Sequence, residues 1–161
     1  AMDVCIETHS LSKTYNMTGW RIGMAVGNAD LIGAFGRVKT NIDSGAFDAI
    51  QRAAIVALTG PQDCVAHACS IYQERRVALV AGLQSLGFTV HIPKATFYVW
   101  MNVNNSVEFT QRMINEAGIV VTPGTGFGPN GEGYVRFAIT RPVDRINEAI
   151  ARMKEHHITG N

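Results

Sequence analysis

The residue in this sequence with the most distinctive chemistry is Lys13, which lies in a segment rich in hydroxyl groups. Ser10, Ser12 and Thr14 surround it, and Arg21 follows eight residues later. A primary amine forms a Schiff base with a carbonyl compound, so a lysine can hold an aldehyde covalently. Hydroxyls and a planar guanidinium are donors that suit a phosphate group. The segment therefore has the groups to bind a phosphorylated aldehyde.

The same residues allow two other interpretations. Lys13 can be an ordinary solvated lysine of a loop, and the residues alone do not separate this from a reactive amine. Ser10 and Lys13 also match the Ser-x-x-Lys pattern of acyl enzymes, in which the serine is the nucleophile. That chemistry needs Ser-Asp-Asn and Lys-Thr-Gly motifs as well, and neither occurs in the sequence. The acyl-enzyme interpretation is therefore disfavoured.

The second candidate is Arg136, which lies within the apolar segment 134–140. A buried charge is costly unless it is paired and hydrogen bonded. An arginine in such a strand either forms an internal salt bridge or binds an anionic ligand, and the residues alone allow both.

The segment 10–23 closely resembles the pyridoxal 5'-phosphate attachment site of class I aminotransferases, which have fold type I. That site reads small residue, apolar residue, small residue and Lys, followed by Gly-x-Arg-apolar-Gly, and each specified position matches here. The resemblance implies that Lys13 forms the Schiff base with the cofactor and later moves protons. It also implies that Ser10 and Arg21 bind the cofactor phosphate.

The resemblance extends to the second arginine. In the family, a strand of the small domain carries an arginine that binds the substrate α-carboxylate, and the wording Tyr-Val-Arg-Phe-Ala-Ile around Arg136 matches it. The implied substrates are an amino acid and a 2-oxo acid, between which the enzyme moves an amino group. The segment Gly124–Gly128 would either close on the active site or form a plain turn.

The resemblance of segment 41–47 to the aminotransferases bears on the partner subunit and on the branch of the family. Relatives use this segment to reach the active site of the opposite subunit, so the resemblance implies a homodimer. Its Asp-Ser-Gly-x-Phe wording is more similar to the LL-diaminopimelate branch than to the classical aspartate enzymes. The expected amino donor is therefore LL-diaminopimelate or aspartate.

Hydrophobic periodicity gives the elements that must position these residues. The expected strands cover residues 2–7, 20–26, 89–92, 97–103, 119–122 and 134–140. The expected helices cover residues 29–39, 47–58, 62–86, 107–116 and 143–156. Lys13 then falls in a polar loop between two strands that are apolar enough to be buried, and Gly87 ends the longest helix.

These elements predict an α/β part followed by an α+β part. Together with the resemblance, they predict the C-terminal part of fold type I. Residues 1–60 would be the end of the large cofactor-binding domain, residues 61–87 a long connecting helix and residues 88–161 a small domain. In the family, the residues that bind the cofactor ring precede the lysine, and the first residues here already alternate as a strand does. We therefore expect a fragment of a transaminase that is inactive alone, with a non-catalytic isolated domain as the alternative.

Composition argues against several other classes of protein. The chain has 161 residues, of which 47% are hydrophobic and 17% charged, with a net charge of +1 and no basic cluster. We therefore expect no nucleic-acid or membrane partner, and no apolar run approaches the roughly 20 residues of a membrane helix. The odd number of cysteines (Cys5, Cys64 and Cys69) lacks metal-ligand spacing. This favours a reducing cytoplasm and predicts no metal site.

Overall fold

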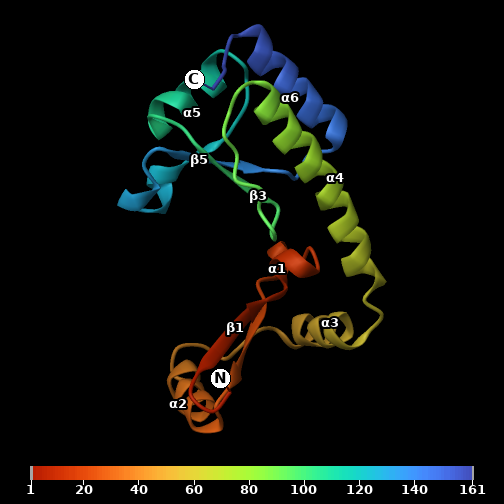
Figure 1. Ribbon diagram of the computed structural model, residues 1–161. Helices are drawn as coiled ribbons and strands as arrows, with labels where there is room; N and C mark the ends of the chain where they lie inside the picture. Colours follow the sequence, from red (N-terminus) through yellow and green to blue (C-terminus); the bar gives the residue numbers. More distant parts are fainter. Residues whose placement is uncertain (1, 161) are drawn as a thin grey trace. The chain divides into compact units, whose positions relative to one another are not determined.

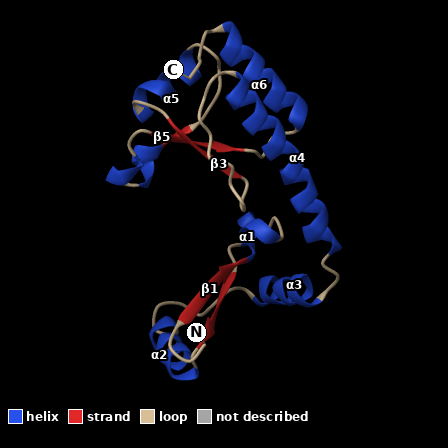
Figure 2. Cartoon of the chain, in the orientation of Figure 1, coloured by secondary structure: helices blue, strands red, loops and turns tan. Residues whose placement is uncertain are grey.

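The computed structural model describes residues 2–160, and the chain divides into two compact units, Ala1–His67 and Ala68–Asn161. The division falls inside helix α4 (Asp63–Ser85), which matches the long helix predicted for residues 62–86. The sequence places domain boundaries at residues 60 and 87 instead, on either side of this helix. Figures 1 and 2 show the elements of each unit.

The first unit is built around a two-stranded antiparallel ribbon. Its strands pair in register from Ile6 with Gly27 to Ser10 with Gly23. Asn28 ends the ribbon and caps the next helix, because its side chain accepts hydrogen bonds from two backbone N–H groups at 3.0 Å each. The elements in chain order are β1 (Ile6–Ser10), α1 (Leu11–Thr14), η1 (Thr18–Trp20), β2 (Gly23–Gly27), α2 (Ala29–Lys39) and α3 (Asp48–Thr59).

Two sequence predictions for this ribbon are wrong. The first strand begins at Ile6 rather than at residue 2, because the residues before it form a turn. The strands are also not buried, since all five residues of β1 are exposed. A ribbon of two strands has two open faces, and within the first unit nothing covers them enough to bury β1. The polar loop predicted between the strands contains the helix α1.

The second unit contains a three-stranded antiparallel sheet in the order β3-β5-β4. One face of the sheet is fully apolar, with Val99 and Met101 on β3 and Val135 and Phe137 on β5. These side chains join one core cluster with buried residues of α4, α5 and α6. The elements after α4 are β3 (Tyr98–Asn102), α5 (Ser106–Asn115), β4 (Thr122–Pro123), η2 (Gly124–Phe127), η3 (Pro129–Gly131), β5 (Tyr134–Ala138) and α6 (Val143–Glu155).

Helices α4 and α6 run side by side over this core (Figure 1). A Cβ added to Gly82 would lie 2.5 Å from Cγ1 of Ile150, so the glycine lets the two helices approach closely. The helix α4 ends at Ser85, and Gly87, which the sequence predicts as its cap, has a positive φ of +87°. The backbone N–H of Phe88 donates to the carbonyl of Leu83 at 3.1 Å and closes the last turn.

Two predicted strands of this unit are shorter than expected. Residues 89–92 form only one bridge, between Val90 and Met101, and Pro93 follows with no N–H to donate. Of residues 119–122, only Thr122 belongs to a strand, the short β4, which ends at Pro123 because the turn η2 begins at Gly124. Among the described residues, no helix combines the length and hydropathy needed to cross a bilayer.

Candidate functional site

The hairpin end of β1 and β2 carries Lys13 on a single helical turn. Ser10 caps this turn, because its Oγ accepts a hydrogen bond from the backbone N–H of Ser12 at 3.2 Å. Lys13 lies three residues after the cap, in the last turn of α1, and is exposed. The spacing of a Ser-x-x-Lys motif is thus present, but the helix that follows the serine has only four residues.

Apolar packing fixes this turn on the first unit. Leu11 and Met17 on either side of Lys13 are buried against Ala54 of α3. The hydroxyl of Tyr15 donates a hydrogen bond to Oε1 of Gln62 at 2.9 Å. These buried residues flank Lys13, so the packing holds the backbone of the turn while the lysine side chain is exposed.

Arg21 belongs to the same hairpin end. Its backbone is left-handed, with φ 53°, and its Nη1 donates to the carbonyl oxygen of Thr18 at 2.9 Å. The hydroxyl of Thr18 in turn donates to the carbonyl oxygen of Ser12 at 3.0 Å. These bonds connect the segment of Arg21 to the turn that carries Ser10 and Lys13. The structure therefore brings the three residues with a predicted cofactor role onto one braced loop.

Gly23 ends this loop and has a steric reason to be glycine. A Cβ at this position would lie 2.6 Å from the carbonyl oxygen of His9 on the paired strand. Gly19 has no such neighbour, since nothing lies within 4 Å of a Cβ built there. The structure explains one glycine of the motif and gives no account of the other.

Arg136 lies on the open face of the second unit's sheet, opposite the apolar core. Its Cζ is 4.1 Å from the ring centroid of Tyr98 and 4.5 Å from that of Phe127. Its Nε is buried without a hydrogen-bond partner, and within residues 2–160 the side chain forms no ion pair. Of the two possibilities that the sequence leaves open for Arg136, an internal salt bridge is therefore not found in the described chain.

Further aromatic rings surround this arginine on the same face. Trp100, which pairs with Arg136 across the sheet, stacks on Tyr134 with 5.6 Å between ring centroids. Trp100 also forms a T-shaped contact with Phe127, with 5.4 Å between ring centroids. The sequence does not predict that Tyr98, Trp100 and Phe127 gather around this arginine. The available signal was the position of Phe127 inside the glycine-rich segment Gly124–Gly128.

The glycine-rich segment holds Phe127 through close backbone contact. A Cβ at Gly124 would lie 1.8 Å from the carbonyl oxygen of Gly131, so η2 and η3 pack backbone to backbone. Gly128 between them has φ +114°, a conformation that favours glycine. The segment forms two short 3-10 turns, and one of them places an aromatic ring on Arg136.

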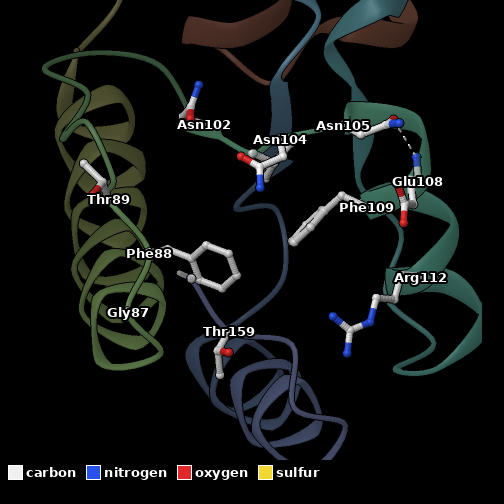
Figure 3. A pocket seen from close by; sticks show the side chains of 12 residues that line it. Gly87, Phe88, Thr89, Asn102, Asn104, Asn105, Glu108, Phe109, Arg112 and Thr159 are labelled. Carbon is white, nitrogen blue, oxygen red and sulfur yellow. Dashed lines mark hydrogen bonds between the residues drawn. The ribbon is translucent and has the colours of Figure 1, made fainter.

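A hollow of about 360 Å³ opens elsewhere in the second unit (Figure 3). Phe88 and Phe109 enter it from opposite sides, and Asn104, Arg112 and Thr159 also point towards it. The Arg112 guanidinium is already engaged, because it bonds to Glu116 and to the carbonyl oxygens of His156 and His157. None of the predicted site residues lines this hollow.

Segment 41–47 is an exposed turn that the structure braces internally. Asp43 accepts hydrogen bonds from the amine of Lys39 and from the backbone N–H of Gly45, and both interactions hold the pKa of its carboxyl below the ordinary value. Ile42 and Phe47 are 73% and 74% exposed. Within the described chain no group of histidine, cysteine, aspartate and glutamate side chains could hold a metal ion.

Comparisons with known proteins agree with the resemblance. A family model described as "Aminotransferase class I and II" matches residues 1–153. LL-diaminopimelate aminotransferases from Syntrophobacter fumaroxidans and Aquifex aeolicus are each 52% identical to this chain. Each match includes 96% of this chain but only 41% of the length of the relative. An aminotransferase structure from Staphylococcus aureus covers 99% of the chain with a TM-score of 0.91 and 36% identity, and the chain covers 43% of it.

The chain thus spans about two fifths of the length of the curated relatives that it matches. Its α/β and α+β parts have the fold of the C-terminal part of a fold type I transferase, as the sequence predicts. The family match also agrees with the motif around Lys13 and disfavours the acyl-enzyme interpretation of Ser10. The chain belongs to the class I and II aminotransferases.

Proposed function

We propose that this chain carries the lysine and carboxylate-binding part of a pyridoxal 5'-phosphate-dependent aminotransferase. The observation that carries the proposal is the braced hairpin end, where an exposed Lys13 lies beside Ser10 and Arg21. Family membership and relatives named as aminotransferases support it. The protein that contains this chain would move an amino group between an amino acid and a 2-oxo acid.

The groups on the hairpin end suit both the aldehyde and the phosphate of this cofactor. Ser10 Oγ accepts a bond from the chain, so its own proton is available for a phosphate oxygen. Arg21 uses one Nη for Thr18, and the rest of its guanidinium can donate to the same phosphate. Lys13 supplies the primary amine that binds an aldehyde. The residues present therefore fit the cofactor's aldehyde and phosphate.

The bound cofactor supplies the electron sink that stabilises negative charge on the substrate α-carbon. With the cofactor bound, Lys13 Nζ would hold its aldehyde carbon and would carry a proton to and from the substrate α-carbon. Arg136 binds the substrate carboxylate and so orients the α-carbon for that proton transfer. Ser10 and Arg21 hold the phosphate in place while these steps occur.

The amino donor is best supported as LL-diaminopimelate. Relatives that bear this name are 52% identical over nearly the whole chain. The Asp43-Ser44-Gly45 turn carries the wording on which the branch assignment rests. Comparison of LL-diaminopimelate with L-aspartate as donors would test it. A higher kcat/KM for aspartate would contradict the assignment.

A homodimer in the cytoplasm is part of the same proposal. The strongly exposed Ile42 and Phe47 lie in the segment that, by its resemblance to the family, would reach a second subunit, and burial there would remove both from water. The odd number of cysteines, Cys5, Cys64 and Cys69, suits a reducing compartment. Sedimentation of the full-length protein would test the dimer, and a monomer at micromolar concentration would contradict it.

The covalent role of Lys13 can be tested directly. Borohydride reduction of the full-length protein should fix the cofactor on the peptide that contains Lys13, as seen by mass spectrometry. Lys13→Ala should lose that adduct and reduce transamination by about 10²- to 10⁴-fold, because the proton carrier is gone. Lys39→Ala is the matched control, since that exposed amine is paired with Asp43. An adduct on another lysine would refute the assignment.

A further inference from the structure

We propose that Tyr98 and Phe127 form an aromatic clamp that positions Arg136, so that a substrate carboxylate is bound through the two Nη groups of the guanidinium. Tyr98 and Phe127 are then positioning residues. The inference rests on the proposed function of Arg136 and assigns to Tyr98 and Phe127 a contact role that the sequence does not predict.

The clamp is defined by two cation–π contacts. The Arg136 Cζ lies 4.1 Å from the Tyr98 ring centroid and 4.5 Å from the Phe127 ring centroid, well inside the roughly 6 Å range of this attraction. A guanidinium is planar, so contact with ring faces restricts the orientation of its plane. Two rings fix that orientation more closely than one ring would.

Exposure decides which edge of the guanidinium a ligand can reach. Nε is shielded from solvent and has no hydrogen-bond partner, whereas the side chain as a whole is only half-buried. The two Nη groups are neither shielded in this way nor bonded to any described residue. A carboxylate that approaches from solvent therefore meets the Nη edge, where two parallel N–H···O bonds can form.

Phe127 owes its position to the backbone rather than to a core. Its side chain is 50% exposed, and its ring also forms a T-shaped contact with Trp100 at 5.4 Å between centroids. The contact of Gly124 with Gly131 fixes the η2 turn from which Phe127 projects. A large apolar ring that stays half in water is poorly explained by burial alone. Its contact with a cation gives it a reason to be there.

The clamp would act by preorganisation. An unrestrained arginine loses rotational freedom when it binds a carboxylate, and this cost weakens binding. Rings that already hold the guanidinium reduce that cost before the substrate arrives. Loss of a ring should therefore raise the dissociation constant of carboxylates and KM, and leave kcat nearly unchanged.

The test uses the full-length holoenzyme and glutarate, a dicarboxylate that has no amino or oxo group to exchange. Phe127→Leu should raise the glutarate inhibition constant and the KM of the amino donor about fivefold, consistent with one lost cation–π contact. Phe127→Tyr keeps a ring and should stay within about twofold of the parent. Tyr98→Leu, with Tyr98→Phe as its control, repeats the comparison from the β3 side of the clamp.

A second readout does not depend on activity. In protein labelled with ¹⁵N-arginine, the Arg136 Nε–H signal should exchange slowly with solvent and be shifted upfield by the rings. Phe127→Leu should accelerate its exchange and remove part of the shift. Addition of glutarate should move the Nη proton signals downfield more than the Nε proton signal.

The outcomes separate the clamp from the role of Arg136 itself. If Arg136→Gln leaves glutarate inhibition unchanged, the proposed carboxylate site is wrong. If Arg136→Gln abolishes inhibition but both leucine variants bind glutarate like the parent, the carboxylate site stands and the clamp is refuted. A larger shift of the Nε proton than of the Nη protons would overturn the assigned edge.

Discussion

Glu132 accepts hydrogen bonds from the backbone N–H of Ser106 at 2.9 Å and from its hydroxyl at 3.0 Å. These bonds and one from the backbone N–H of Gly133 hold the pKa of the Glu132 carboxyl below its ordinary value of 4.5. The fully buried Ser106 begins α5, and Glu132 lies just before β5, so one carboxylate connects the helix to the strand of Arg136. The contribution of the Glu132 carboxylate to the stability of the fold depends on its negative charge.

Acid should therefore weaken this connection. Because the folded-state pKa is lowered, the stabilisation is present above the unfolded-state pKa and is lost as the pH falls through the lower value. Glu132→Gln should flatten the fall of unfolding free energy below about pH 4.5, measured by urea titration at several pH values. Glu155→Gln, at the exposed end of α6, is the control. Equal acid sensitivity in parent and Glu132→Gln would contradict this role.

Single residues also show how far sequence reasoning extends. Lys13 and Arg136 could be proposed as site residues because their neighbours carry strong local signals, a hydroxyl-rich motif and an apolar strand. The contacts of Tyr98 and Phe127 with Arg136 could not be predicted, because they depend on sheet register and on the path of a turn. Contacts between residues distant in sequence leave no periodic pattern.

At the scale of elements, the turn η2 requires glycine at position 124 but not at position 126. A Cβ at Gly124 would collide with backbone oxygens of Gly131 and Tyr134, at 1.8 and 2.7 Å. Gly124→Ala should therefore cost about 1–3 kcal/mol in unfolding free energy, since backbone cannot move aside as a side chain can. It should also raise KM, because Phe127 would shift with the turn.

Gly126→Ala is the matched control for this substitution. Its Cβ would meet only Cγ2 of Thr122, at 4.0 Å, which is ordinary contact. This variant should change stability by less than about 0.5 kcal/mol. Equal unfolding free energies for the two alanine variants, measured by urea titration, would show that the Gly124–Gly131 contact does not hold η2.

Helices were predicted more accurately than strands for a physical reason. The predicted helix 29–39 coincides with α2, and residues 62–86 lie within a residue of α4, because caps and 3.6-residue periodicity are local. The expected strands 89–92 and 119–122 shrink to a bridge and a two-residue strand. A strand requires a partner with free backbone groups, and the alternation of its own residues does not reveal whether one exists.

At the scale of the whole molecule, the two units differ in how much apolar surface they bury. Among the described residues, the core cluster of the second unit has eighteen buried members and that of the first has three. Fourteen of the twenty exposed large apolar side chains belong to the first unit. Since burial of apolar surface is the main source of stability, the first unit taken alone has the weaker basis for independent folding.

Hydrogen exchange should show this difference. In the isolated 161-residue chain, the amides of β3 and β5 should be protected far longer than those of β1 and β2, because core strands open only with global unfolding. In the full-length protein, β1 and β2 should gain protection if further chain covers their faces. Similar amide protection of β1 and β2 and of β3 and β5 in the isolated chain would contradict the prediction. The isolated chain should also show no transamination, which an amino-transfer assay can check.

The pairing of Ser10 with Gly23 has a consequence for which sequence changes this protein can tolerate. Within the loop between them, the hydroxyl of Thr18 donates to the carbonyl oxygen of Ser12, and Arg21 donates to the carbonyl oxygen of Thr18. Inserting or deleting one residue between Ser10 and Gly23 would break these bonds and displace Arg21 relative to Lys13. In descendants of this chain, insertions and deletions should therefore be absent from residues 11–22 and should fall in exposed turns such as residues 94–96.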